Sequence, residues 1–112
     1  MANHYLFICS ANKDRSKTAE DYFSSKFPNL KFESAGTNLK TCNKLGTHYI
    51  NIEMLQRADK IYLMETKHLK VIQKTFGNRF YNKINVLHIA DFYKYGSTEL
   101  IQILNAIVCF DN

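Results

Sequence analysis

Residues 6–16 of this chain are Leu6-Phe7-Ile8-Cys9-Ser10-Ala11-Asn12-Lys13-Asp14-Arg15-Ser16. An apolar run ends at a cysteine, mostly small or polar residues follow, and an arginine and a serine then open an amphipathic segment. This order predicts a strand, a loop and the start of a helix. The pattern C-x5-R-S in this setting is typical of a phosphate-binding loop. Backbone N–H groups and a helix N-terminus can surround the anion, an arginine fork can bind its oxygens, and a thiolate can lie beneath it.

Cys9 and Arg15 are the two residues of this loop best suited to chemistry. Cys9 could be a small buried hydrophobe at the end of a strand, which is the commoner role of cysteine. Unpaired N–H groups at the helix start, Arg15 and the Ser16 hydroxyl would all favour a thiolate, so we interpret Cys9 as a nucleophile. Arg15 could make only a surface salt bridge, but an arginine opposes the dipole at a helix N-terminus, and a bound anion would explain its position.

The other loop residues are expected to shape the anion site. Asn12 tolerates the left-handed backbone that a loop with inward-facing N–H groups requires. Ser16 is either an ordinary residue of the first helical turn or a hydrogen-bond donor to the thiolate. A carboxylate inside an anion site is unfavourable, so we expect Asp14 to point outward and cap the helix. The predicted phosphate-binding residues are Ser10, Ala11, Asn12, Lys13, Asp14, Arg15 and Ser16.

Short apolar runs alternate with amphipathic segments along the whole chain. The runs predict strands at residues 5–9, 31–34, 60–64 and 84–89. Helical spacing predicts helices at residues 15–26, at 47–58 with Thr47 or His48 as the cap, at 65–76, and from about Ser97 onward, and residues 38–46 are expected to form a loop. The last helix is expected to bury Leu100, Ile103, Leu104, Ile107 and Val108. Alternating strands and helices form βαβ units, so we expect one α/β domain over residues 1–112, a parallel sheet with helices on both faces.

Polar residues follow the predicted strands at the edge where such sheets bind ligands. Ser34, Glu65 and Asp91 follow the second, third and fourth strands, just as Cys9 ends the first. Asp91 lies among aromatic residues, where apolar surroundings could keep its carboxyl group protonated as a general acid, although it could also be a turn residue. The nearby aromatic side chains could line a substrate site or pack against the last helix; they are Phe92, Tyr93 and Tyr95.

The composition indicates an ordered globular protein, with 46% apolar and 13% aromatic residues. A formal charge of +5 favours phosphate-bearing partners. The lysines are scattered and form no basic block, so we expect no nucleic-acid partner. The N-terminus lacks the features of a signal peptide and no apolar run is long enough to cross a bilayer, so we expect a cytoplasmic protein that does not bind membranes.

Cysteine and histidine usage argues against disulfides and metal centres. The three cysteines are Cys9, Cys42 and Cys109, an odd number with no C-x-x-C pair, so at least one thiol is expected to be free. The four histidines are His4, His48, His68 and His88, and they show no ligand spacing to one another. We interpret all four as structural or exposed and expect no metal and no cofactor.

With these residues in view, the chain resembles the low-molecular-weight protein tyrosine phosphatase family. The similarity covers most of the chain and is clearest in four blocks that occur in the family's order. They are residues 6–20, Ser34–Thr37, Ala58–Glu65 and Asp91–Tyr93. The resemblance implies a three-layer α/β/α fold with a four-stranded parallel sheet and the flavodoxin-like topology of phosphotyrosine phosphatase I.

The resemblance also implies roles for individual residues. Cys9 would attack phosphorus and carry a phosphocysteine, Arg15 would bind the phosphoryl oxygens, and Asp91 would be the general acid. Asn12 and Ser16 would organise the loop, and Ser34 would support it through Asn12. The partner implied is a phosphorylated protein or a small phosphate monoester.

The chain departs from the family pattern in and near the loop. Ala11 replaces a glycine, Lys17 replaces a proline, and Phe92 follows the expected acid where a proline is usual. Asp14 replaces the cysteine that protects some members from oxidation. Residues 38–57 form a shorter segment than in typical members, as in the compact bacterial subgroup.

Two other functions are compatible with the sequence. Arsenate reductases share this fold and loop but use resolving cysteines in the C-terminal half, where this chain has only Cys109. The departures at Ala11, Asp14 and Lys17 are also compatible with a protein that binds phosphorylated ligands without turnover.

Overall fold

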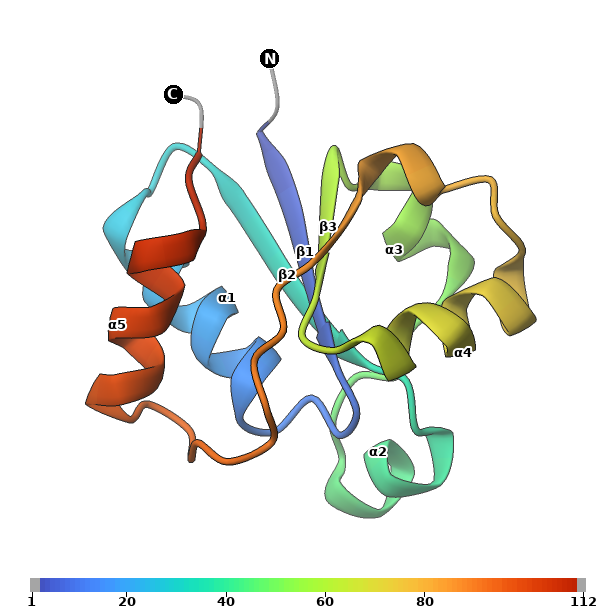
Figure 1. The fold of residues 1–112 in the computed structure, drawn as a ribbon, viewed down its shortest axis with the longest axis horizontal. Coiled ribbons are helices and arrows are strands. Elements are labelled where there is room, and N and C mark those ends of the chain that lie inside the picture. Colours follow the sequence, from blue (N-terminus) through green and yellow to red (C-terminus); the bar gives the residue numbers. More distant parts are fainter. Residues whose placement is uncertain (1–2, 111–112) are drawn as a thin grey trace.

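A four-stranded parallel sheet forms the centre of the molecule in the computed structural model, which describes residues 3–110 (Figure 1). The strands are β1 (His4–Cys9), β2 (Lys31–Gly36), β3 (Lys60–Leu63) and β4 (Ile84–Val86). Their order across the sheet is β2-β1-β3-β4, and all neighbouring pairs are parallel. This is the flavodoxin-like order, so the predicted fold class is confirmed.

Helices cover both faces of the sheet (Figure 1). One layer consists of α1 (Arg15–Lys26) and α5 (Thr98–Ile107), and the other of α3 (Ile52–Arg57) and α4 (Thr66–Phe76). A short helix, α2 (Leu39–Leu45), lies beyond the carboxyl ends of the strands, and a 3-10 turn at Tyr81–Lys83 precedes β4. No helix within residues 3–110 is long and apolar enough to cross a membrane.

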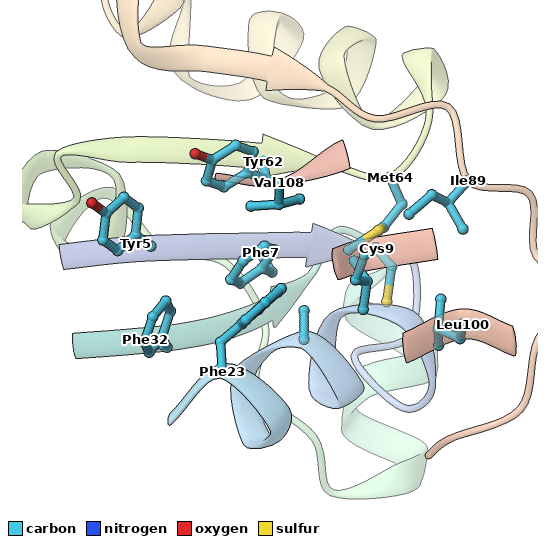
Figure 2. Packing of buried hydrophobic residues seen from close by; sticks show 12 residues of the cluster. Tyr5, Phe7, Cys9, Phe23, Phe32, Tyr62, Met64, Ile89, Leu100 and Val108 are labelled. Carbon is cyan, nitrogen blue, oxygen red and sulfur yellow. The ribbon is translucent and has the colours of Figure 1, made fainter. Parts of the chain in front are cut away.

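Strand β1 is the centre of both hydrophobic cores. Its residues Tyr5 to Ile8 are fully buried, which explains the uninterrupted apolar run in the sequence. Because side chains alternate along a strand, Tyr5, Phe7 and Cys9 face α1 and α5, as Figure 2 shows, whereas Leu6 and Ile8 face α3 and α4. Cys9 therefore ends the strand on the same side of the sheet as α1.

Aromatic packing fixes α1 against the sheet and so positions the loop that precedes it. Phe23 of α1 stacks on Phe7 with ring centroids 5.7 Å apart, and Phe7 also stacks on Tyr62 at 5.2 Å (Figure 2). Phe110 packs edge-on against Phe23 at 4.8 Å. Helix α1 has the predicted bounds, with Ala19 and Phe23 buried on its inner face.

The segment at residues 38–46 was predicted to be a loop, and that prediction is wrong, because it contains α2. Asn38 caps this helix by accepting the Thr41 N–H at 3.0 Å, and Gly46 ends it in left-handed backbone with φ 72°. Cys42 is its one buried residue, so the hydrophobic pattern was too weak to reveal the helix.

The next helix is shorter than predicted. Helix α3 begins at Ile52, and its cap is Asn51, whose side chain accepts the Met54 N–H at 2.9 Å. The predicted caps Thr47 and His48 have other roles, since the Thr47 hydroxyl and the His48 N–H both bind the loop after β1. Asn51 was overlooked as the cap because the preceding Ile50 fits the helical spacing.

Two predictions near the C-terminus also need correction. Strand β4 ends at Val86 rather than at residue 89, because His88 adopts left-handed backbone with φ 58° and interrupts the strand. Ile107 was predicted to be buried and is 47% exposed. Helix α5 ends at Ile107, and the extended backbone of Val108 turns the chain back toward the sheet, so Val108 is buried instead.

Candidate active site

The loop between β1 and α1 surrounds a small cavity of about 70 Å³. Its lining consists of Cys9, Ser10, Ala11, Lys13, Asp14, Arg15 and Asp91. The structure thus brings the predicted nucleophile, arginine and acid to one place. Asn12 and Ser16 are buried behind the loop, and Asn12 adopts left-handed backbone with φ 55°.

Hydrogen bonds to the loop carbonyls determine where its N–H groups point. The Cys9 and Ser10 carbonyl oxygens accept the N–H groups of Thr37 and Asn38, both at 3.0 Å, and the Ala11 carbonyl accepts the Thr47 hydroxyl at 2.6 Å. In a trans peptide the C=O and the following N–H point in opposite directions. The N–H groups of residues 10–12 therefore point away from these partners, as an anion-binding loop requires.

Gly36 allows the loop to approach the end of β2 closely. A Cβ atom at this position would lie 2.5 Å from the Ser10 carbonyl oxygen and 2.6 Å from the Cys42 sulfur. Any larger residue would push the loop outward. Cys42, buried and reduced, thus fills space beneath the loop.

The side chain of Asn12 sets the direction of the hydrogen bonds behind Cys9. Its Oδ1 accepts the His48 N–H at 3.1 Å, so its Nδ2 must face Ser16 and Ser34, to which it donates at 2.9 and 2.8 Å. Ser16 Oγ lies 3.0 Å from Cys9 Sγ. Ser16 accepts a hydrogen bond from Asn12, and its own hydrogen can be donated either to the Cys9 sulfur or to the Ala35 carbonyl oxygen at 3.5 Å. This arrangement suits a thiolate at Cys9.

Ser34 connects this network to α1. It accepts from Asn12 and donates to Glu20 Oε1. No buried polar side-chain atom within residues 3–110 lacks a hydrogen-bond partner, so the network is fully satisfied. A satisfied buried network holds its members in a single arrangement.

Arg15 is 2% exposed and is held from one side. Its Nη1 donates to Glu65 Oε2 at 2.6 Å and to the Ile89 carbonyl at 2.7 Å. Both hydrogens of Nη1 are used, so Nε and Nη2 remain for an anion, and these are the two donors of a bidentate contact. The hydrogen bond from Arg15 lowers the pKa of the Glu65 carboxyl group below its usual value.

His68 is a site residue that the sequence did not reveal. It is buried in the first turn of α4, and its Nδ1 accepts the Glu65 N–H at 3.0 Å. Its Nε2 must then carry the ring proton and donate it to Ser10 Oγ, 2.9 Å away. Burial, followed by the positive charge of Arg15, lowers the pKa of His68 to about 4. His68 is therefore neutral at pH 7.

Ser10 connects the small cavity to a larger one. A hollow of about 460 Å³ begins at its other side and is lined by Ser10, Thr37, Asn38, Leu39, Lys67, His68 and Val71. Since Ser10 Oγ accepts from His68, its own hydrogen can be donated to a ligand in either space.

Asp91 lies at the cavity but in surroundings different from those predicted. Its side chain is 65% exposed, and its Oδ1 is 3.8 Å from Arg15 Nε. The predicted apolar surroundings are absent, because the neighbouring Phe92 points into solvent and is 77% exposed. Tyr93 alone of the nearby aromatic residues packs against the core, and Tyr95 is exposed.

Asp14 was predicted to point outward and cap the helix, but it lines the cavity and does not cap the helix. It occupies the cap position of α1 and makes no side-chain hydrogen bond to that helix. Its Oδ1 instead accepts the Tyr95 N–H at 2.9 Å. The backbone at Asp14 is in the helical region, which is unsuitable for the usual cap geometry.

The remaining cysteine and histidines lie apart from the cavity lining. Cys109 is exposed beyond the end of α5. His4 pairs with Glu33 at 2.6 Å. Among residues 3–110, no group of three or more His, Cys, Asp or Glu side chains could hold a metal ion.

No protein-family model matches the sequence, and no curated protein sequence matches it significantly. Solved structures match it well. The tyrosine phosphatase Wzb from Escherichia coli K30 in complex with phosphate is 22% identical, with a TM-score of 0.72 over 95% of this chain and 93% of that one. Vibrio vulnificus Wzb in complex with benzylphosphonate is 19% identical, with a TM-score of 0.75 over 95% and 94%. The YwlE arginine phosphatase from Geobacillus stearothermophilus is 18% identical, with a TM-score of 0.69 over 92% and 88%.

These similarities establish the fold. A structure described as a low molecular weight protein tyrosine phosphatase from Streptococcus pyogenes also matches, at 19% identity with a TM-score of 0.63 over 77% of this chain and 72% of that one. The chain therefore has the fold of the low-molecular-weight tyrosine phosphatases, and the resemblance seen in the sequence is confirmed for the fold. What this chain does must be argued from its own site.

Proposed function

We propose that this chain is a cysteine-dependent phosphatase that hydrolyses phosphate monoesters through a phosphocysteine on Cys9. The observation that carries the proposal is the set of hydrogen-bonding groups around the sulfur. Asn12 holds Ser16, whose hydroxyl lies 3.0 Å from Cys9 Sγ and can donate to a thiolate there, and the remaining donors of Arg15 lie at the same cavity. A thiol, a proton donor to its anion and a fixed guanidinium are the groups that thiolate attack on phosphorus requires.

In the first step, Cys9 Sγ attacks phosphorus, the S–P bond forms and the bond to the leaving oxygen breaks. That oxygen takes the electron pair and a proton from Asp91. The N–H groups of the loop and the free side of Arg15 bind the phosphoryl oxygens, whose charge is spread in the transition state.

In the second step, water attacks the phosphocysteine and the S–P bond breaks. The electron pair returns to the Cys9 sulfur, where the Ser16 hydroxyl stabilises the thiolate by donating a hydrogen bond. Asp91, now a carboxylate, takes the proton of the water. Phosphate is released, and no metal or cofactor enters the scheme.

The substrate class we propose is a phosphoprotein bearing phosphotyrosine, or a small aryl phosphate. Tyrosine phosphatases among the structurally similar proteins support this choice, and the exposed Phe92 and Tyr95 near Asp91 supply aromatic surface. An arginine phosphatase shares the same fold, so a phosphoarginine protein belongs in the same test.

The test is hydrolysis of para-nitrophenyl phosphate by the native protein and three variants. Cys9→Ser should abolish turnover, and Asp91→Asn should reduce it by about 100-fold, because the phosphocysteine then lacks the base that takes the proton of the attacking water. Cys109→Ser is the matched control, because this exposed thiol is outside the site, and it should retain native activity. Undiminished turnover by Cys9→Ser would refute the proposal.

A binding protein without turnover is the second candidate, favoured by the solvent exposure of Asp91. It predicts that inorganic phosphate raises the unfolding temperature while no aryl phosphate is hydrolysed. Turnover that requires Cys9 and is inhibited by vanadate would exclude this candidate.

A further inference from the structure

The loop that carries Asp91 is fastened to the first two turns of α1. Asp14 Oδ1 accepts the Tyr95 N–H at 2.9 Å, and Thr18 Oγ1 accepts the Gly96 N–H at 2.9 Å. The two acceptors are four residues apart and so lie on one face of the helix start. Two consecutive backbone N–H groups of the loop are thereby fixed to the helix that also carries Arg15.

A third contact extends this attachment. The Tyr95 hydroxyl donates to Asp21 Oδ2, which belongs to the next turn of α1. Asp21 is itself paired with Lys17 at 3.3 Å. Tyr95 is thus held at both its backbone and its side chain, although its ring is half exposed.

The rest of this loop has few other attachments. Asp91, Phe92 and Lys94 are exposed, and Tyr93 is the one aromatic residue of the loop that packs against the core. Two further backbone hydrogen bonds of the segment, from Phe92 N–H to the Ala90 carbonyl and from Ser97 N–H to the Lys94 carbonyl, stay within it. They shape the loop without locating it on the protein. The loop is also held before Asp91 at Ile89, whose N–H donates to the Met64 carbonyl and whose carbonyl accepts from Arg15. The position of Asp91 relative to Cys9 therefore depends on Ile89 at one end of the loop and on the contacts of Tyr95 and Gly96 to α1 at the other.

The hydrogen bond from the Tyr95 N–H explains why a negatively charged residue occupies position 14. A carboxylate in the lining of an anion site weakens anion binding. The same carboxylate is a strong acceptor for a backbone N–H group, and its hydrogen bond to Tyr95 is made directly beside the cavity.

We propose that Asp14 is a positioning residue: its hydrogen bond to the Tyr95 N–H fixes the loop so that Asp91 reaches the leaving oxygen of a substrate on Cys9. This inference rests on the proposed phosphatase function. It assigns to Asp14 a role in leaving-group protonation rather than in phosphate binding, to which its charge is opposed.

Leaving groups of different acidity give the sharpest test, because a weakly acidic phenol needs a proton donor and a strongly acidic one does not. The substrates are phenyl phosphate and para-nitrophenyl phosphate. Asp14→Ala should lower kcat/KM, which reports the phosphorylation step alone, by about tenfold on phenyl phosphate and by less than about threefold on para-nitrophenyl phosphate. An equal loss on both substrates would overturn the inference, since it would indicate damage to the loop around Cys9.

Asp14→Asn separates the acceptor from the charge. Its amide oxygen can still accept the Tyr95 N–H, so the native ratio of the two kcat/KM values should be kept. Loss of the negative charge should tighten inhibition by inorganic phosphate by about fivefold. If Asp14→Asn changes the ratio of the two kcat/KM values as much as Asp14→Ala does, the hydrogen bond to Tyr95 is not the cause.

The double variant Asp14→Ala/Asp91→Asn completes the test. If Asp14 acts through Asp91, adding Asp14→Ala to Asp91→Asn should cause no further loss that depends on the leaving group. Additive losses would contradict the inference.

Hydrogen exchange of the loop amides distinguishes failure of this inference from failure of the proposed function. Asp14→Ala should increase exchange at Tyr95 and Gly96, and Asp14→Asn should not, whatever the activity. A native protein without Cys9-dependent turnover would refute the proposed function and this role together. Turnover with faster exchange but an unchanged ratio of the two kcat/KM values would refute the positioning role alone.

Discussion

The ring Nε2 of His68 lies 2.9 Å from the hydroxyl oxygen of Ser10, the residue that follows Cys9. The Glu65 N–H occupies the other ring nitrogen, so His68 can only be the donor in this contact. The first turn of α4 therefore supports the floor of the site through Ser10, and Glu65 supports Arg15 from the same turn. Ser10 and Arg15 of the loop are therefore both held in place by the start of α4.

The first prediction concerns the pH dependence of the free energy of unfolding that follows from the low pKa of His68. Its pKa is about 4 in the folded protein and near 6.5 when unfolded, so the unfolded chain binds more protons between these values. The free energy of unfolding should therefore fall as the pH decreases from 6.5 to 4, by at most about 3 kcal/mol from this residue. Urea unfolding across that range measures the effect.

His68→Gln is the matched variant for this experiment. A glutamine amide can still donate to Ser10, and it does not titrate, so the variant should lose less stability over the same pH interval. A pH dependence identical to that of the native protein would show that His68 is not responsible.

A second prediction separates the backbone of Asn12 from its side chain. Asn12→Gly keeps access to the left-handed backbone but loses the hydrogen bonds to Ser16, Ser34 and His48. Asn12→Ala loses these hydrogen bonds and also adopts the left-handed backbone less readily, so it should be less stable than Asn12→Gly by about 1 kcal/mol. Chemical denaturation measures the difference.

Both Asn12 variants should also reduce kcat by about tenfold or more, because the hydrogen bond that holds the Ser16 hydroxyl beside the Cys9 sulfur is lost. Native turnover in Asn12→Gly would contradict the role given to this network. Equal stability of the two variants would contradict the backbone argument.

A third prediction concerns the pair formed by Arg15 and Glu65. Glu65→Ala removes the carboxylate that balances a nearly buried guanidinium, and it should lower stability by about 2 kcal/mol. Phosphate supplies a replacement anion. Its effect on the unfolding temperature should therefore be larger in Glu65→Ala than in the native protein. A smaller shift in the variant would show that Glu65 does not compete with an anion for Arg15.

A fourth prediction addresses arsenate reduction. Cys109 is followed by Phe110, whose ring packs on Tyr5 at the start of β1 with centroids 4.6 Å apart, whereas Cys9 ends that strand. The start and end of β1 are separated by about 16 Å. Incubation with arsenate and a thiol reductant should therefore give no disulfide between Cys9 and Cys109 by peptide mass mapping. Arsenate-dependent formation of this disulfide would favour the reductase.

The sequence predicts the strand, loop and helix around Cys9 because their signals are local. The apolar run of β1 ends at Cys9 and Arg15 opens α1 at the predicted residue. Parallel strand order also follows, because alternating strands and helices allow few other arrangements. The correct placing of Ser34 and Asp91 at the same edge is a consequence of that order.

The errors share a physical origin in contacts between distant segments. Thr47 resembles a helix cap, yet its hydroxyl binds the Ala11 carbonyl across 36 positions of sequence. Asp14 resembles a cap in the same way and binds Tyr95 instead. His68 was not recognised as a site residue because it shows no metal-ligand spacing to the other histidines. The one available signal was its position three residues after Glu65 at a helix start, which is the spacing of a capping box.

The central claim is that Cys9 becomes phosphorylated during turnover. Mass spectrometry of the peptide containing Cys9, after rapid acid quenching of the protein with para-nitrophenyl phosphate, tests it directly. We predict one phosphoryl group on Cys9 in the native protein, a larger amount in Asp91→Asn because that variant lacks the base for hydrolysis of the intermediate, and none in Cys9→Ser. Steady turnover with unmodified Cys9 in every sample, or with the phosphoryl group on another residue, would contradict the account.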